Sequence, residues 1–417
     1  MRRIAIALAA AVAVLPSIRY LSDLRYRLDP ALKHAVCQSL ACSEDLLLDS
    51  AKRASEGGPS NIPVVLANLQ EAVRRNIASP NRWCDLGQAL RQARRIDEAR
   101  YCYSEALELG SRNPPVLWKT ALFYMRIKER RNALKYMAQL LELAPEYKDL
   151  IFYIYVINIR DVADTFEFGI PKQRQTGQDY FRYILTKSPV QDVKKAWKWM
   201  KANGLADRET AGLYVDFLIA HREFSSAPEV WLKAAGPDKR YLKPNLVYNG
   251  DFEMEPAQVG LDWTFHPNRG VRIRRVSTTA FSGSSSMEIE FDGSENIEFN
   301  DLAQRTIVEP GRYKFKAWVR TSGLTTDQGI GFRLVDPSNR VNPITTRVLT
   351  QTHDWTPVET EYAWPGPTGP LRIEVVRHTS LRFDNKVKGR VWIDAISLTK
   401  AAPAPHPPTL AQQLSAQ

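Results

Sequence analysis

Two adjacent stretches between Asn81 and Tyr147 carry the same residue pattern at a spacing of 34 positions. The shared slots hold Trp83, Leu86, Gly87, Leu90, Ala99, Tyr103 and Ala106, and then Leu117, Thr120, Ala121, Tyr124, Ala133, Met137 and Leu140 before Pro145. Small residues fall where two helices must approach closely, and large apolar residues fall where neighbouring hairpins bury a face. A supersecondary unit repeated at this period cannot bury its apolar face alone, so the pattern predicts stacked helical hairpins.

The repeated slots resemble the tetratricopeptide repeat, whose tryptophan–leucine–glycine, alanine and proline positions have that period. The resemblance implies a scaffold that binds peptides or proteins and carries no chemistry of its own. Residues 64–75 match the second helix of a preceding hairpin. Residues 161–178 break the period and predict an inserted loop, after which two degenerate units follow up to about residue 235. We therefore predict a helical repeat domain over residues 61–240, preceded by a polar spacer over residues 19–60.

The pattern changes near Gly236, and short alternating segments replace the helical periodicity. They are bounded by Gly, Pro, Asn, Asp and Ser clusters, which is typical of an all-β sandwich. The segments are 271–276, 286–291, 313–319, 331–335, 371–376 and 391–398. The predicted fold class is therefore multidomain α plus β: a helical solenoid followed by a β-sandwich over residues 241–400. The Ala-, Pro- and Gln-rich residues 401–417 predict a disordered tail.

Three motifs in the second half stand in a recognisable order. Asn-Gly-Asp-Phe-Glu begins at Asn249, Pro-Gly-Arg-Tyr begins at Pro310, and Ile-Asp-Ala-Ile-Ser-Leu begins at Ile393. This order resembles the jelly-roll carbohydrate-binding modules that accompany many polysaccharide-degrading enzymes, over about residues 243–399. The resemblance implies a jelly roll and a sugar-binding face.

The same resemblance implies a structural calcium ion where the first and last strands meet. Its ligands would be Asp251 or Glu253 together with Asp394, since calcium takes carboxylates from well-separated parts of a chain. One departure is that Ala395 stands where the family often has a second acid. In the alternative interpretation, Asp251 caps the turn and Asp394 accepts backbone hydrogen bonds.

Alternation along residues 313–320 predicts two faces for one strand. One face is predicted to face the core, and it holds Tyr313, Phe315, Ala317 and Val319. The predicted glycan-binding residues share the other side or lie in phase on strands expected beside it: Lys314, Lys316, Trp318, Arg320, Arg333 and Arg372. An aromatic ring among cationic groups suits a sugar that bears carboxylate or phosphate. The alternative is a solvated sheet with ion pairs to Glu288, Glu290 and Glu298, and Trp263, Trp355 and Trp392 are expected in the core.

The N-terminus predicts export. Arg2 and Arg3 precede twelve apolar residues that end at Pro16, which is the pattern of an export signal over residues 1–18. No clean cleavage site follows, so either a cleaved signal or an uncleaved inner-membrane anchor fits, in the periplasm or cell envelope. Four cysteines fit an oxidising compartment. Cys84 and Cys102, at matching heights on two antiparallel helices, are predicted to form a disulfide or to be buried thiols, and Cys37 with Cys42 is a second candidate pair.

The distribution of charge and the absence of catalytic motifs limit the classes of function that the sequence favours. Residues 1–240 hold 37 basic and 27 acidic residues, whereas residues 241–417 hold 20 and 19, so the basic surplus belongs to the helical half. It could attract nucleic acid, anionic lipid headgroups or an acidic partner, or it could belong to a solvated helix surface. The export signal disfavours nucleic acid. The sequence has no phosphate-binding loop, nucleophile elbow or His-Glu-x-x-His motif. We predict a non-catalytic adaptor with a protein partner and a glycan ligand, and no nucleic acid, in envelope or extracellular polysaccharide assembly. The alternative is a purely structural scaffold.

Overall fold

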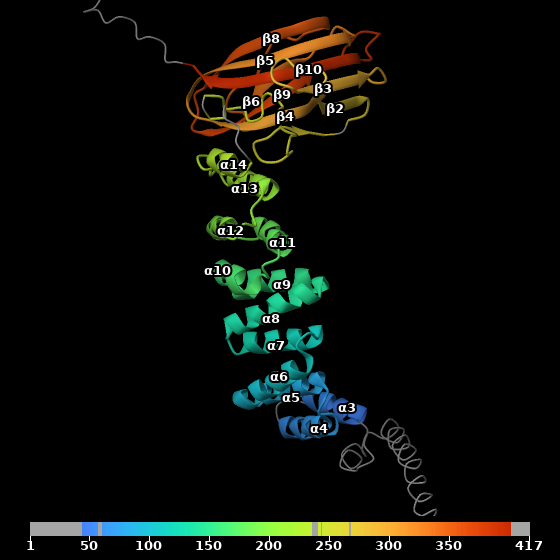
Figure 1. The fold of residues 1–417 in the computed structure, drawn as a ribbon, viewed down its shortest axis with the longest axis vertical. Coiled ribbons are helices and arrows are strands. Elements are labelled where there is room, and N and C mark those ends of the chain that lie inside the picture. The colour runs from blue at the N-terminus through green and yellow to red at the C-terminus, as the bar shows by residue number, and fades with distance from the viewer. Residues whose placement is uncertain (1–43, 57–60, 236–240, 243, 267, 402–417) are drawn as a thin grey trace, which may run out of the picture. The chain divides into compact units, whose positions relative to one another are not determined.

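A computed structural model describes residues 44–56, 61–235, 241–242, 244–266 and 268–401 of the chain (Figure 1). The chain divides into two compact units, residues 1–183 and residues 184–417. The first unit is helical. The second contains the last helices and two β-sheets, so the final hairpin belongs to the same compact unit as the sandwich.

The first unit begins with three helical hairpins. Their helices are α3 (Glu44–Glu56), α4 (Ile62–Arg75), α5 (Pro80–Gln92), α6 (Ile96–Gly110), α7 (Pro114–Arg126) and α8 (Arg130–Leu143). The slots predicted to face the core are buried, with Tyr124 half-buried. A side chain at Gly87 would place its Cβ 2.9 Å from a ring carbon of Tyr103, so α5 and α6 approach each other as closely as the small-residue slot predicts.

The segment after α8 differs from the predicted inserted loop. It contains η3 (Pro145–Tyr147), α9 (Lys148–Ile154), the π-helix η4 (Tyr155–Ile159), α10 (Val162–Asp164), the π-helix η5 (Thr165–Gly169) and α11 (Arg174–Leu185). Phe166 is fully buried, and the Tyr155 hydroxyl donates a 2.7 Å hydrogen bond to the carbonyl of Gly169. Buried aromatic packing therefore keeps helical turns where glycine and proline predicted a loop.

The second unit joins α12 (Val190–Ala202), α13 (Arg208–Ala220) and α14 (Ala227–Ala235) to a β-sandwich. Its strands are β1 (Thr264–Phe265), β2 (Val271–Val276), β3 (Ser286–Asp292), β4 (Phe299–Val308), β5 (Gly311–Leu324), β6 (Gly331–Val335), β7 (Ile344–Thr345), β8 (Gln351–Trp364), β9 (Gly369–Arg377) and β10 (Lys388–Lys400). The first sheet has the order β1-β4-β9-β6-β7 and the second the order β2-β3-β10-β5-β8, and the paired strands within each are antiparallel. Helices followed by a β-sandwich confirm the predicted fold class.

Each predicted segment forms a strand, but the predicted segments omit the two short strands β1 and β7 and the two longer strands β4 and β8. The inward positions of β4 include the polar residue Gln304, so the alternation of apolar and polar residues is not visible in the sequence. The side-chain amide of Gln304 donates a hydrogen bond to the carbonyl of Tyr248 and accepts one from its N–H group. β8 contains Pro357, a residue that usually argues against a strand. It is tolerated because β8 lies at the edge of the second sheet.

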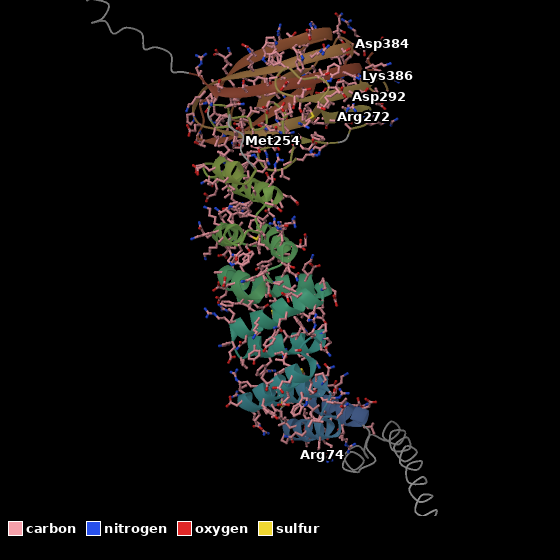
Figure 2. All side chains as sticks on the ribbon, in the orientation of Figure 1. Arg74, Met254, Arg272, Asp292, Asp384 and Lys386 are labelled. Carbon is pink, nitrogen blue, oxygen red and sulfur yellow. The ribbon has the colours of Figure 1, made fainter. Side chains whose placement is uncertain are left out.

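The apolar core lies between the two sheets, where side chains such as Trp263, Phe315 and Ile393 are fully buried. The outer rim carries polar side chains. Figure 2 shows Arg272 of edge strand β2 at one end of the sandwich, with Asp292 at the end of the neighbouring strand β3. This separation of apolar and polar residues is the usual arrangement of packed antiparallel sheets.

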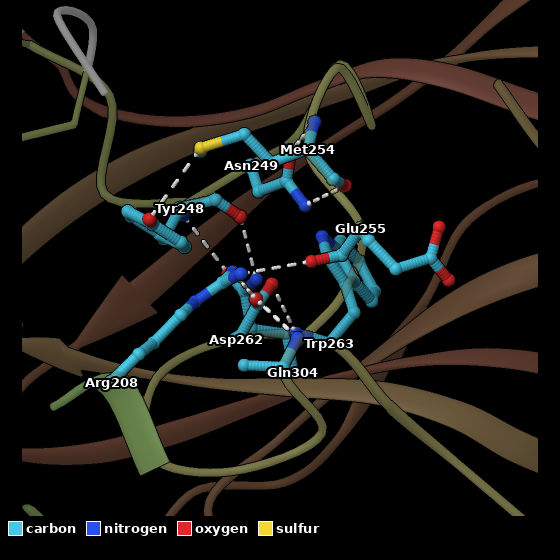
Figure 3. A network of polar contacts seen from close by, with 9 residues as sticks. Arg208, Tyr248, Asn249, Met254, Glu255, Asp262, Trp263 and Gln304 are labelled. Atoms are coloured by element: carbon cyan, nitrogen blue, oxygen red, sulfur yellow. Dashed lines mark hydrogen bonds and ion pairs between the residues drawn. The ribbon is translucent and has the colours of Figure 1, made fainter. Parts of the chain in front are cut away.

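A buried carboxylate attaches α13 to the sandwich (Figure 3). The side chain of Asp262 is fully buried. One of its carboxylate oxygens accepts hydrogen bonds from the guanidinium of Arg208 at 2.5 Å and from the backbone amide of Ala257 at 2.8 Å. The other oxygen accepts a hydrogen bond from the backbone amide of Trp263. Arg208 also donates to the carbonyl of Glu255. The last repeat helices and the sandwich are thus joined, within one unit, by an ion pair whose carboxylate is fully buried.

Several predicted features lie outside the described residues: the export segment over residues 1–18, Cys37, Cys42 and all of the predicted tail except Ala401. Within the part of the chain that the structure describes, no helix is long and apolar enough to cross a bilayer. Residues 44–56 of the predicted polar spacer form the helix α3, which pairs with α4.

Candidate functional site

The outer face of the second sheet is the first candidate site, because β5 has the predicted two faces. Tyr313, Phe315, Ala317 and Val319 are buried, and Lys314, Lys316, Trp318 and Arg320 lie on the other side. Strands β10 and β8 flank β5, so this outward row is bordered by side chains from both of them.

The cationic side chains on this face are ion-paired. Glu359 of β8 accepts from Lys316 at 2.9 Å and from Lys314 at 3.3 Å, and these two partners hold the pKa of Glu359 below its ordinary value. Arg320 lies 3.6 Å from the exposed carboxylate of Asp354. The face therefore presents donors and acceptors side by side rather than an uncompensated positive surface. The partners are not those expected, because Glu288 and Glu290 pair with arginines of β2 and β10, and Glu298 pairs with His378.

The expected placement of Arg333 and Arg372 beside this row is wrong. Arg333 lies on β6 and Arg372 on β9, and both strands belong to the first sheet. Each guanidinium has a nitrogen 2.7 Å from Glu374. Alternation correctly predicts that both face outward, but alternation along a strand carries no information about which sheet the strand joins.

An aromatic cluster stands beside the paired cations. The rings of Phe281 and Trp318 stack with centroids 3.9 Å apart and planes 15° apart, and Trp355 meets Phe281 edge-on at 5.8 Å. Phe281 is 39% exposed and is the outermost of the three. We call Phe281, Trp318 and Trp355 the aromatic ridge.

The three tryptophans expected in the core differ in position. Trp263 is fully buried between the sheets, as expected. Trp355 belongs to the aromatic ridge instead. Trp392 of β10 stands opposite Arg320 in the strand pairing, and the Arg320 guanidinium covers its ring at 5.6 Å, so Trp392 lies on the outer face under a cation.

Two of the predicted calcium ligands hold the loop that presents Phe281. One oxygen of Asp394 accepts the backbone N–H groups of Phe281 and Ser282, each at 2.8 Å. Glu253 accepts from the amide and hydroxyl of Ser284 and from the amide of Ser285. Two carboxylates from distant parts of the chain therefore fix the loop between β2 and β3.

The electrostatics of these two carboxylates agree with that role. Burial raises the pKa of Asp394 above its ordinary value, against the opposing effect of its backbone donors. Burial would also raise the pKa of Glu253, but the bonds from Ser284 and Ser285 outweigh it and lower that pKa.

The residues present do not fit the predicted calcium ion well. Calcium needs several oxygens with lone pairs directed at one point, whereas the carboxylates of Glu253 and Asp394 are directed at N–H and O–H donors. Among the described residues, no group of three or more His, Cys, Asp or Glu side chains is arranged to hold a metal ion. Asp251 lies in the turn after Gly250. The calcium ion stays a prediction, and the arrangement favours the alternative in which Asp394 accepts backbone hydrogen bonds.

The first and last segments of the sandwich do meet, as the motifs predict. The amide of Ile396 donates to the carbonyl of Gly250 at 2.8 Å. A Cβ at Gly250 would lie 2.2 Å from the carbonyl oxygen of Ile396, so the glycine of the Asn-Gly-Asp-Phe-Glu motif is required by close backbone contact.

Cys84 and Cys102 are free, buried thiols, which is the second of the two predicted alternatives. Cys102 faces Gly87, since its Cβ is 3.3 Å from the place that a Cβ of Gly87 would take. Gly87 lies three positions after Cys84, or about 4.5 Å along the helix. Cys84 therefore lies nearly one helical turn from the residue that Cys102 faces.

One family model and several solved structures are similar to parts of this chain. Residues 80–113, which contain α5 and α6, match the family model of the tetratricopeptide repeat. No curated protein sequence matches the chain.

Solved structures similar to the β-sandwich include three carbohydrate-binding modules. The CBM22-1 xylan-binding domain of Paenibacillus barcinonensis Xyn10C is 14% identical, with 37% of this chain and 94% of that chain covered and a TM-score of 0.28. TmCBM61, solved with β-1,4-galactotriose, is 18% identical, with coverage of 38% and 99% and a TM-score of 0.29. A family 16 carbohydrate-binding module is 21% identical, with coverage of 37% and 100% and a TM-score of 0.26.

Sequence analysis singled out Trp318 but not the residues that position it. Phe281 was missed because a lone aromatic before Ser282 and Gly283 has the appearance of a turn residue. The pairing of Asp394 with Phe281 spans 113 positions, and no local pattern indicates it.

Proposed function

We propose that this chain is a non-catalytic adaptor that docks a protein partner on its helical repeats and binds a glycan on the outer face of its second sheet. The observation that supports the glycan is the aromatic ridge. Its rings Phe281 and Trp318 are stacked and partly exposed, and two carboxylates hold the loop that carries Phe281. The tetratricopeptide repeat at residues 80–113 supports the protein partner.

The surroundings of the ridge favour a neutral sugar over the acidic sugar expected from the sequence. A sugar hydroxyl both donates and accepts a hydrogen bond. The Lys316–Glu359 pair offers a donor and an acceptor together, and the Lys316 ammonium is 5.1 Å from the ring centroid of Trp318. An acidic sugar would have to displace Glu359 from its lysines, whereas a neutral sugar can stack on Phe281 and bond to both partners of the pair.

The proposed setting is the cell envelope or the outside of the cell. It rests on the apolar segment that follows Arg2 and Arg3 and on the pairing of a protein-docking half with a glycan-binding half. In this setting the adaptor would hold a glycan near a protein of polysaccharide assembly or export.

Affinity electrophoresis of the full chain tests the glycan site. The chain is run through gels that contain a neutral polysaccharide, such as xylan or galactan, or an acidic one, such as alginate. Phe281→Ala and Trp318→Ala are compared with Trp199→Ala, which removes a half-buried tryptophan from α12, outside the sandwich.

We expect retardation in a neutral gel that is insensitive to salt and weakened about five- to thirtyfold by Phe281→Ala or Trp318→Ala, since ring stacking and burial contribute about 1–2 kcal/mol. Retardation in the acidic gel alone, equal in all variants and abolished by salt, would reflect only the net charge of +11 and would refute the site. No retardation in any gel would support the structural scaffold instead.

A further inference from the structure

The loop between β9 and β10 exposes two large apolar side chains completely. The side chain of Leu381 is 98% exposed and that of Phe383 is entirely exposed, whereas the next such residue of the described chain, Ile77, reaches 67%. Exposure of this extent means that the two side chains bury no area against the sandwich. We call residues 381–386 the loop tip. Figure 2 shows Asp384 and Lys386 of the loop tip at the end of the sandwich that also carries Arg272 and Asp292.

The base of this loop is fixed by side chains of two neighbouring loops. Asn296 exchanges two 2.9 Å hydrogen bonds with the backbone of Ser380, and the Ser380 hydroxyl donates to Asp327 at 2.6 Å. On the other side of the tip, Thr325 exchanges two hydrogen bonds with the backbone of Lys388, at 2.8 and 2.9 Å. Both ends of the loop tip are therefore bonded to the sandwich, and the tip is a held protrusion.

Fully buried Arg377, the last residue of β9, fixes the two neighbouring loops. Its guanidinium donates to the carbonyl of Ile297 and, at 3.0 Å, to the hydroxyl of Thr326. Burial lowers the pKa of Arg377, and the negative charges of Glu298 and Asp327 oppose that effect. A buried cation bonded to both loops keeps in place the groups that hold the base of the loop tip.

Cations accompany the exposed apolar pair. Residues 381–390 contain four cations and one acid: Arg382, Lys386, Lys388 and Arg390 against Asp384. Arg382 and Arg390 have carboxylate partners at 3.3 and 3.0 Å. Within the described residues, Lys386 and Lys388 are exposed and form no ion pair. Two ammonium groups without a counter-charge therefore stand beside two exposed apolar side chains.

We propose that the loop tip inserts Leu381 and Phe383 into an anionic lipid surface, while Lys386 and Lys388 bind phosphate groups of the lipid headgroups. Insertion of the apolar side chains is favourable because it removes apolar area from water. The lysines are attracted to anionic headgroups, and their long apolar stems let the ammonium groups stay at the level of those headgroups. The inference goes beyond the proposed function and rests on no residue of the aromatic ridge.

A lipid surface fits the loop tip better than a folded protein partner does. A stable protein interface buries about 800 Å² on each partner and involves about 20–30 residues. The tip offers only two apolar side chains, on a protrusion with charged neighbours. Insertion into lipid needs no matching groove, and it gains from each apolar side chain separately. The unpaired lysines match the negative charge of an anionic leaflet.

The loop tip and the aromatic ridge lie apart on the sandwich. The tip precedes Lys388, at the start of β10, whereas the loop that carries Phe281 is bound to Asp394, further along the same strand. The residues between these two positions span roughly 20 Å of an extended strand. The two sites can therefore be tested independently.

The test follows the acetylation rate of individual lysines in the full chain by mass spectrometry. The vesicles contain phosphatidylcholine alone or an equal mixture of phosphatidylcholine and phosphatidylglycerol. Lys386 and Lys388 report on the loop tip, and the exposed Lys198 and Lys201 of α12 report on the same unit outside the sandwich. Separate lysine rates distinguish contact at the tip from binding through the apolar residues 4–15, which a measurement of total binding would not do.

The variants are Leu381→Ser, Phe383→Ser and Lys386→Gln. Their side chains are exposed, so the substitutions leave the packing of the sandwich unchanged. Leu150→Ser is the apolar control, because it removes a 46% exposed leucine from α9. Lys198→Gln is the charge control. Polyglutamate serves as a soluble acidic probe that offers negative charge without an apolar phase.

We expect the anionic vesicles to slow acetylation of Lys388 and to leave the rate at Lys201 unchanged. The lipid concentration that halves the rate at Lys388 should rise at least about tenfold in Leu381→Ser or Phe383→Ser, the loss for one buried apolar side chain. It should rise about fivefold in Lys386→Gln, the loss for one lysine at an anionic surface. The two control variants should behave as the unmodified chain does.

Four results would overturn the inference. Equal slowing at Lys388 and Lys201 would mean that the chain lies on the vesicle without using the loop tip. Slowing that is unchanged in Leu381→Ser and Phe383→Ser, or that polyglutamate reproduces, would make the contact purely electrostatic and favour an acidic protein. Equal slowing by neutral vesicles would refute the role of the lysines. No slowing at Lys388 with either vesicle would refute the site altogether.

Failure of this inference is distinguishable from failure of the proposed function. Retardation of Leu381→Ser in the neutral polysaccharide gel should equal that of the unmodified chain, because the loop tip lies outside the aromatic ridge. The gels therefore measure the glycan site and the acetylation rates measure the loop tip.

Discussion

Replacing Arg208 with methionine should destabilise the second unit, because it leaves a buried carboxylate without its cation. The side chain of Asp262 is fully buried, and that of Arg208 is 30% exposed. Removing one partner of a fully buried ion pair costs about 3–5 kcal/mol. Asp262 keeps the amide donors of Ala257 and Trp263, and Arg208 is partly solvated, so we expect a smaller loss of about 2 kcal/mol in the free energy of unfolding.

The sign of the pH dependence gives a sharper test. Burial raises the pKa of Asp262, and Arg208 opposes that rise. In the Arg208→Met variant the pKa must rise further, since the opposing cation is gone. Protonation of Asp262 at low pH removes the unpaired charge, so the difference in stability between the two proteins should be largest near neutral pH and should shrink as the pH falls through the pKa of the variant.

Hydrogen exchange followed by mass spectrometry in increasing urea measures this loss in the full chain. Peptides from residues 248–263 report on the second unit, and peptides from α5 to α8 report separately on the first. The matched control is Arg272→Met on β2, where the arginine side chain is 69% exposed and its partner Glu290 keeps Arg390. A surface pair of this kind contributes at most about 1 kcal/mol.

The reasoning predicts a further result for a double variant. Arg208→Met combined with Asp262→Asn removes both charges, so the combined loss should be smaller than the sum of the two single losses. Equal losses for Arg208→Met and Arg272→Met, or a loss for Arg208→Met that does not change between about pH 7 and pH 4, would refute the assignment of Asp262 as a desolvated, charged anchor.

Two further predictions concern groups that the sequence assigned to bridges or metals. Burial raises the pKa of Cys84 to about 12 and that of Cys102 to about 11, so both thiols should resist iodoacetamide in the native chain and react in urea. A peptide cross-linked between Cys84 and Cys102 in a non-reducing digest, or rapid labelling of either thiol in the native chain, would contradict this. Because Glu253 and Asp394 already accept hydrogen bonds, a chelator should leave the melting temperature unchanged; a rise of more than about 2 °C on adding calcium would show that the ion binds.

Local patterns were sufficient to predict most helices of this chain and the two faces of β5, although they missed four strands and predicted a loop where α10 and η5 form. The 34-residue spacing predicts the hairpins of α5 to α8, since the small-residue slots and the apolar slots are set by contacts within one unit and its neighbours. Alternation along β5 predicts which side chains are buried, because successive residues of a strand point to opposite faces. Both arguments use only residues that are close in the sequence.

The composition of the candidate site was decided by long-range pairing. Arg333 and Arg372 were assigned to the wrong sheet, since strand order depends on which strands pair and not on the pattern of any one strand. Lys316 and Arg320 form ion pairs with Glu359 and Asp354 of β8, which no local pattern indicates. The carboxylate of Asp394 accepts a hydrogen bond from the backbone N–H of Phe281, which lies 113 positions away in the sequence. The sequence by itself determined the helical repeat and the two-faced strands. Only the tertiary structure decided which charges are neutralised, which rings stack and which carboxylates anchor a loop, because those contacts join residues that are far apart along the chain.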